Sequence, residues 1–168
     1  MNEDLLEKLR KAGRNRVVIS HAVGASNDGQ YALLKAALFG GAIELYAVPA
    51  ALAYWLIDRI GEAIEAGAIK DLRSTAATGS PEAQQLALYG VTRPEISDAD
   101  WELASRRIAG EIRAHAFGNA LGLMTVTEGV ETLLVLPDQV AILLHDSLTL
   151  VATYLIDRAH PPVSLRRH

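Results

Sequence analysis

The chain has 168 residues, no cysteine and a formal net charge of −4 at pH 7. This length is enough for one domain with a real hydrophobic core, and the lack of cysteine excludes disulfides, thiolate metal sites and a cysteine nucleophile. The acidic balance argues against general nucleic-acid binding. Half of the residues are hydrophobic but only 5% are aromatic, which favours closely packed helices of small aliphatic residues.

The first predicted elements lie before residue 42. Residues 2–13 have the apolar spacing of a short amphipathic helix. Residues 17–19 are ambiguous, because three β-branched residues favour a strand but the run is short. Residues 26–28 (Ser-Asn-Asp) are good helix caps, so a helix is expected from there to Gly40-Gly41.

Residues 43–90 contain one predicted helix that begins at Pro49 and the clearest linker of the chain. Residues 43–48 fit either a strand or a continuation of the preceding helix. Pro49 suits the first turn of a helix that ends near Gly67. Residues 75–81 are rich in small and turn-forming residues and form the clearest linker, followed by a short helix over 81–90.

The second half begins with capping residues at 97–100, which predict a helix from Trp101 through Phe117. Residues 119–136 are apolar again, and Thr125 to Val130 leave a strand possible there. The clearest helix of the sequence spans Leu136 to Arg158. It has a proline in its first turn and aliphatic residues at steps of three and four.

Two short sequence matches suggest an internal duplication. His21-Ala22-Val23-Gly24 resembles His115-Ala116-Phe117-Gly118, and Leu56 to Arg59 is repeated at Leu155 to Arg158. The two matches occur in the same order, so we interpret the chain as a single domain, 1–168, with possible repeat halves 1–74 and 82–160.

The predicted fold is therefore all-α, a multi-helix bundle with two pseudo-symmetric halves joined by the linker 75–81. The alternative is an α/β unit in which 17–20 and 43–48 are parallel strands flanking a helix.

Candidate ligand or metal-binding residues are the histidines and carboxylates placed in apolar surroundings. These are His21, Glu44, His115, Glu128 and Glu131. Buried carboxylates need partners, and a histidine from each half could supply one. The paired Glu-x-x-His motif of di-metal bundles is missing, so metal identity and cofactor stay unknown. In the simpler interpretation these acids pair with Arg107, Arg113 or Lys35, or face water.

The loop His21 to Gly29 is a second candidate site, because in the α/β alternative it would place backbone N–H groups where a phosphate could bind. It matches neither a P-loop nor a dinucleotide fingerprint, so an ordinary capped turn is the simpler interpretation. Ser20, His21 and Asp28 also lack the context of a nucleophile elbow.

Three functional hypotheses remain. The leading one is a non-enzymatic, self-associating binding or assembly protein, expected to be a soluble, cytoplasmic homo-oligomer without a secretory signal or nucleic-acid partner. The alternative is a small enzyme or ligand-binding bundle with a His/Glu pocket between the halves. The last is a membrane-active protein with helical hairpins at 31–57 and 116–156, although the charges within them make insertion costly.

Overall fold

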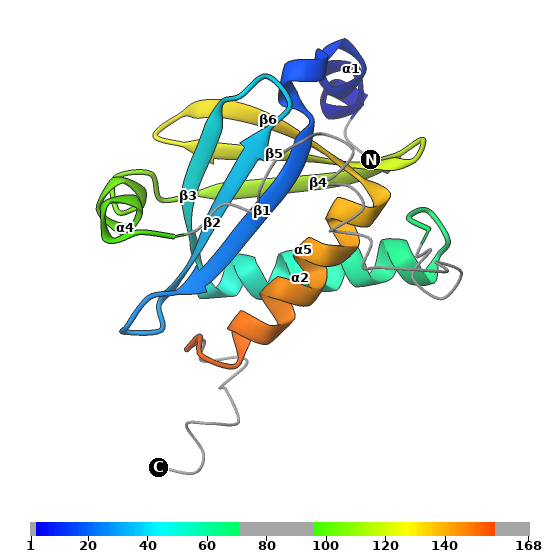
Figure 1. Ribbon diagram of the computed structural model, residues 1–168. Coiled ribbons are helices and arrows are strands. Elements are labelled where there is room, and N and C mark those ends of the chain that lie inside the picture. The colour runs from blue at the N-terminus through cyan, green and yellow to red at the C-terminus, as the bar shows by residue number, and fades with distance from the viewer. Residues whose placement is uncertain (1–2, 71–95, 157–168) are drawn as a thin grey trace, which may run out of the picture.

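The computed structural model describes residues 3–70 and 96–156, which form two successive units of similar element order (Figure 1). The first unit consists of α1 (Glu3–Lys11), the 3-10 turn η1 (Arg14–Arg16), β1 (Val18–Ala25), β2 (Tyr31–Leu38), β3 (Ile43–Pro49) and α2 (Ala50–Glu65). The second consists of α4 (Asp98–Ala104), β4 (Glu111–Phe117), β5 (Ala120–Thr127), β6 (Val130–Pro137) and α5 (Asp138–Ala152).

The predicted all-α helical bundle is wrong, because each unit contains a three-stranded antiparallel sheet. The α/β alternative fails as well, since 17–20 and 43–48 are not parallel strands around a helix. The stretch expected to be that helix is β2, the central strand of the order β1-β2-β3. Likewise, the helix expected to run to Phe117 ends at Ala104, and β4 follows it.

The physical reason for these errors is that the central strands are buried on both faces. In β2 the side chains of Leu33 and Leu34 point to opposite faces, yet each is at most 3% exposed. In β5, Leu123 and Met124 are both 1% exposed. A strand covered on both sides loses the alternation of apolar and polar residues and resembles a buried helix in sequence.

Three of the helix starts predicted from proline and capping signals are confirmed, those at Pro49, 97–100 and Pro137, whereas the caps at 26–28 precede the strand β2. Pro49 and Pro137 each end a third strand and directly precede a long helix, as expected for a residue that lacks the backbone N–H. Ser97 caps α4, and its hydroxyl accepts from the backbone N–H of Asp100 while the Asp100 carboxylate accepts from the Ser97 N–H. The predicted linker 75–81 and the helix over 81–90 lie outside the described residues.

The helix that opens each unit packs on the outer face of the other unit's sheet. From α1, Leu9 packs with Met124 of β5. From α4, Trp101 packs with Leu33 of β2, and its ring lies over Gly24. One ion pair supports each contact: Lys8 Nζ lies 2.7 Å from Glu131 Oε2, and Lys35 Nζ lies 2.8 Å from Asp100 Oδ2.

The long helices α2 and α5 pack against each other and cover the inner faces of the sheets (Figure 1). Each of these helices also contacts the sheet of the other unit, since α5 packs on β1 and α2 packs on β4. The main core lies between these helices and the strands. Its largest fully buried members include Tyr46, Leu56, Ile60, Leu123, Leu134 and Leu144.

Two short parallel bridges join the edges of the sheets. Val17, just before β1, bridges to Val135 of β6, and Ile108, just before β4, bridges to Ala47 of β3. At the second bridge the Ala47 N–H donates to the Arg107 carbonyl at 3.0 Å, and the Ala109 N–H donates to the Ala47 carbonyl at 2.9 Å. We call these two bridges the seams between the units.

The seams and the repeated tetrapeptides align the two units differently. At the seams Val17 corresponds to Ile108, whereas the tetrapeptides match His21 with His115. His21 faces α5, whereas His115 pairs with Gly122, which faces Leu9 of α1. These two histidines therefore occupy opposite sides of their sheets. Leu56 to Arg59 lies inside α2, while Leu155 follows α5. The duplication stays a prediction.

The segments 31–57 and 116–156, expected as helical hairpins in the membrane-active hypothesis, each contain strands followed by a helix. In the described part of the chain, no helix has both the length and the hydrophobicity needed to span a bilayer.

Candidate functional site

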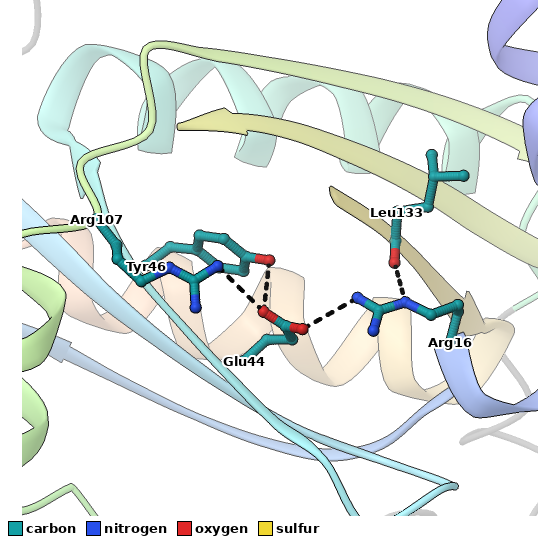
Figure 2. Close-up of polar contacts among 5 residues, drawn as sticks. All are labelled: Arg16, Glu44, Tyr46, Arg107 and Leu133. Atoms are coloured by element: carbon teal, nitrogen blue, oxygen red, sulfur yellow. Dashed lines mark hydrogen bonds and ion pairs between the residues drawn. The ribbon is translucent and has the colours of Figure 1, made fainter. Parts of the chain in front are cut away.

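A row of two arginines and one carboxylate lies at the seams. Figure 2 shows Glu44 between Arg16 and Arg107. The Glu44 Oε1 atom lies 3.2 Å from Arg16 Nη2, and Oε2 lies 3.3 Å from Arg107 Nη2. The Glu44 side chain is only 15% exposed, so its charge needs these partners. Of the three partners that the simpler interpretation offered, Arg107 does pair with Glu44, whereas Arg113 pairs with Glu111 and Lys35 with Asp100.

The two arginines occupy corresponding places in the two units. Arg16 immediately precedes Val17, which bridges to β6, and Arg107 immediately precedes Ile108, which bridges to β3. Each seam therefore places one arginine side chain next to the Glu44 carboxylate. Glu44 reaches the arginines from the inner face of β3, two residues before the buried Tyr46.

Each guanidinium is also held by a contact that does not involve Glu44. Arg16 Nε donates to the Leu133 carbonyl oxygen at 2.9 Å (Figure 2). The Arg107 guanidinium lies 5.0 Å from the centre of the Tyr46 ring, within the range of a cation–π contact. Both cationic groups are thus oriented by contacts that are independent of Glu44.

Tyr46 connects the row to the core. Its side chain is fully buried, and its hydroxyl donates to Glu44 Oε2 at 3.0 Å. Burial raises the pKa of this phenol, and the Glu44 charge adds to the increase, while the hydroxyls of Thr125 and Thr132 lower it.

A hollow of about 390 Å³ opens beside the row. It is lined by Ala12, Arg16, Glu44, Glu131, Thr132 and Leu133. Arg107 lines a second, smaller hollow of about 230 Å³ with Arg106, Thr127, Glu128 and Val130. The arginine row therefore lies between two surface hollows.

The charge of the row is positive. Two guanidinium groups meet one carboxylate, and Glu131 at the rim is already paired with Lys8. Among the described residues, Arg16 Nη1 and the Nε and Nη1 atoms of Arg107 have no hydrogen-bond acceptor. An oxyanion in this place would meet free donors.

The structure brings only some of the predicted site residues together. Glu44 and Glu131 line the same hollow, and Glu128 lines the neighbouring one at the β5–β6 turn. Glu128 has a backbone φ of 50°, as required by that tight turn. These three carboxylates therefore surround the seams without forming one cluster.

The predicted histidines lie elsewhere. His21 is 2% exposed beneath α5, with Nε2 3.1 Å from Ser147 Oγ, and His115 is on the outer side of β4. Within residues 3–70 and 96–156, no three His, Asp or Glu side chains are grouped closely enough to hold a metal ion. The inter-half His/Glu pocket is thus not assembled from this set of five.

The predicted loop His21 to Gly29 is wrong in its first half, because His21 to Ala25 are the end of β1; only the residues after Ala25 form the hairpin turn to β2. Ser26 Oγ donates to Asp28 Oδ1 at 2.6 Å, and the Gln30 N–H donates to the same oxygen at 3.0 Å. These hydrogen bonds lower the pKa of Asp28, that of Ser26 first. The arrangement is that of a turn stabilised by its own side chains.

Sequence reasoning missed Arg16, Arg107 and Tyr46 as site residues. In the sequence, Arg14 and Arg16 in the first half and Arg106 and Arg107 in the second have the pattern of scattered surface charge. The available signal was an arginine directly before an apolar β-branched residue in each half, Arg16-Val17 and Arg107-Ile108. It becomes informative only once both residues are known to bridge a sheet edge.

Comparisons of the chain with models of known protein families, with curated proteins and with solved structures gave no match.

Proposed function

We propose that the protein is a binding protein that takes up an anionic group, a carboxylate or a phosphate, at the arginine row. The observation that carries this proposal is the convergence of Arg16 and Arg107, from corresponding places at the two seams, on one carboxylate beside an open hollow. A guanidinium presents its N–H donors in a fixed plane that matches carboxylate and phosphate oxygens.

The hollow supports a ligand of modest size. Its volume of about 390 Å³ is at the lower end of the range of small-molecule sites, roughly 300–1,000 Å³. Thr132 adds a hydroxyl to its lining, while Ala12 and Leu133 add apolar surface. The ligand would therefore combine an anionic group at Arg16 with a short, partly apolar body.

The test is isothermal titration with inorganic phosphate and, separately, with acetate. Arg16→Gln and Arg107→Gln should each weaken binding by about tenfold or more, since a hydrogen bond to a charged group contributes about 1.5–3 kcal/mol. Arg10→Gln is the matched control, because Arg10 is an exposed arginine on α1 that lines neither hollow. Absence of binding to the unmodified protein, or equal binding by Arg16→Gln, would contradict the proposal.

Self-association is a second candidate function, with a second copy of this chain as the partner. Its support is an apolar surface at the end of α5, where Leu150 and Tyr154 are 69% and 66% exposed. Leu150 lies in the last turn of α5 and Tyr154 in the turn that follows it. A cytoplasmic location remains part of the same proposal.

Native mass spectrometry tests this second candidate. The unmodified protein is expected to be a dimer, and Leu150→Asp should convert it to a monomer. Thr149→Asp, at the neighbouring exposed position of the same helix, should leave the dimer intact. A monomeric unmodified protein would rule out self-association.

A further inference from the structure

The two ion pairs of Glu44 are unusually loose for a carboxylate that is mostly buried. Each arginine contacts it through a single nitrogen, at 3.2 and 3.3 Å. Charge-assisted N–H···O contacts are typically about 2.7–2.9 Å, and arginine often binds a carboxylate through two nitrogens at once. The pairs Lys35–Asp100 and Lys8–Glu131 in the same protein are 2.8 and 2.7 Å long. Glu44 therefore satisfies neither guanidinium well.

The arginines do not depend on Glu44 for their positions. Arg16 is tied to the Leu133 carbonyl oxygen, and Arg107 lies over the Tyr46 ring (Figure 2). Their backbones are fixed by the seams. If the Glu44 carboxylate moves away or loses its charge, two oriented cations remain within reach of one oxyanion.

We infer that Glu44 is a built-in competitor for the ligand: its carboxylate occupies both guanidinium groups in the free protein, and an incoming oxyanion takes them over. This inference rests on the proposed function. Glu44 has room to give way, because it lines the open hollow as well as the row. The ligand is accordingly an anion able to bridge two arginines, which favours phosphate over a single carboxylate, since phosphate offers more acceptor oxygens.

A structural brace is the competing explanation of the same contacts. In that case Glu44 neutralises two arginines at the seams, and removing its charge only destabilises the protein. The two explanations differ in the sign of the effect on anion binding. Loss of a brace leaves binding unchanged or weaker, whereas loss of a competitor makes binding tighter.

The experiment is titration of inorganic phosphate and of acetate into Glu44→Gln, compared with the unmodified protein. The variant should bind phosphate about tenfold more tightly, and acetate should gain less, because phosphate offers the two arginines more acceptor oxygens than a carboxylate does. Glu131→Gln is the matched control, since Glu131 lines the same hollow but contacts Lys8 rather than the row. It should change phosphate affinity much less than Glu44→Gln.

Glu44→Asp is a second variant that keeps the test valid if Glu44→Gln does not fold. The shorter side chain keeps the charge but cannot span both guanidinium groups as Glu44 does, so phosphate affinity should lie between those of the unmodified protein and Glu44→Gln. Phosphate should also raise the melting temperature of both variants more than that of the unmodified protein.

The outcomes separate the inference from the proposed function. Phosphate binding by the unmodified protein that is not tightened by either variant overturns the inference and leaves the proposed function standing. Binding by the variants alone supports the competitor and contradicts anion uptake by the unmodified protein. Failure of all three to bind overturns both.

Discussion

At the scale of single residues, Tyr46 is the point where the polar row meets the hydrophobic core. Burial favours the neutral phenol, and so does the negative charge of Glu44 beside it, so both raise the phenol pKa. The Tyr46–Glu44 hydrogen bond is therefore a sensitive internal probe of the site. Any change that moves or neutralises Glu44 should be detectable at this one ring.

Glu44→Gln should lower the pKa of Tyr46 relative to the unmodified protein. The pKa should still stay above its usual value near 10, because burial is the largest cause of the increase. Since the folded pKa is raised, the associated stability is present below the unfolded pKa and is lost as pH rises through the folded pKa. That alkaline loss begins at the unfolded pKa in both proteins, so in Glu44→Gln it should be smaller and should end at lower pH.

Ultraviolet difference titration measures this effect, with Tyr46→Phe as the control that identifies the signal of this ring among the five tyrosines. An unchanged titration curve in Glu44→Gln would mean that Glu44 has no electrostatic influence on the phenol.

At the scale of elements, α1 is held on the second sheet by a very close approach. A methyl group added at Gly122 would meet the Leu9 side chain, with the nearest carbon only 2.2 Å from the new Cβ. Gly122→Ala should therefore push α1 away and destabilise the protein by about 1–3 kcal/mol. Denaturant unfolding measures the change in free energy of unfolding.

Two variants test whether the clash with Leu9 is the cause. Gly110→Ala should have little effect, because the nearest atom to its added Cβ is 3.7 Å away. Leu9→Ala combined with Gly122→Ala should cost less than the sum of the two single changes. Strict additivity would show that the two positions are not coupled.

The docking of α4 on the first sheet should depend on acid pH. The pKa of Asp100 is lowered first by the hydrogen bond from Lys35 and then by the Ser97 N–H. Because the folded pKa is depressed, the stability it contributes is present above the unfolded value near 3.9 and is lost as pH falls through the folded pKa. Trp101 fluorescence should report the loosening of α4 in this range.

Asp100→Asn should remove most of this acid dependence and lower stability at neutral pH. Asp98→Asn is the matched control, since Asp98 is an exposed residue in the first turn of the same helix. Similar acid curves for Asp100→Asn and the unmodified protein would show that the Lys35–Asp100 pair does not hold α4.

The elements also show where sequence reasoning succeeds. Local signals were sufficient for α2, α4 and α5, because Pro49, Ser97 and Pro137 act on the backbone within one turn. They failed for β2 and β5, because the burial of both faces comes from helices distant in sequence. For the same reason Glu44 could be singled out as a charge in an apolar run, whereas its arginine partners are brought to it only by the seams.

At the scale of the whole molecule, no unit can complete its own core. The outer face of the first sheet is covered by α4 and that of the second by α1, so each unit borrows a helix from the other. Each long helix also contacts the sheet of the other unit, and each seam joins strands of different units. Removing either unit would expose the buried faces of the other to water, at a cost of about 25 cal/mol for each Å² of apolar surface.

This reciprocal packing predicts that the units unfold together. The chain has two tryptophans, Trp55 on α2 in the first unit and Trp101 on α4 in the second. Trp55→Phe and Trp101→Phe each leave a single fluorescent reporter, and their urea midpoints should agree with each other and with the circular dichroism transition once each variant's own stability is taken into account. If the fluorescence midpoint of a variant departs from its own circular dichroism midpoint, the units unfold independently. The exchange of helices would then be a contact between two domains rather than a shared core.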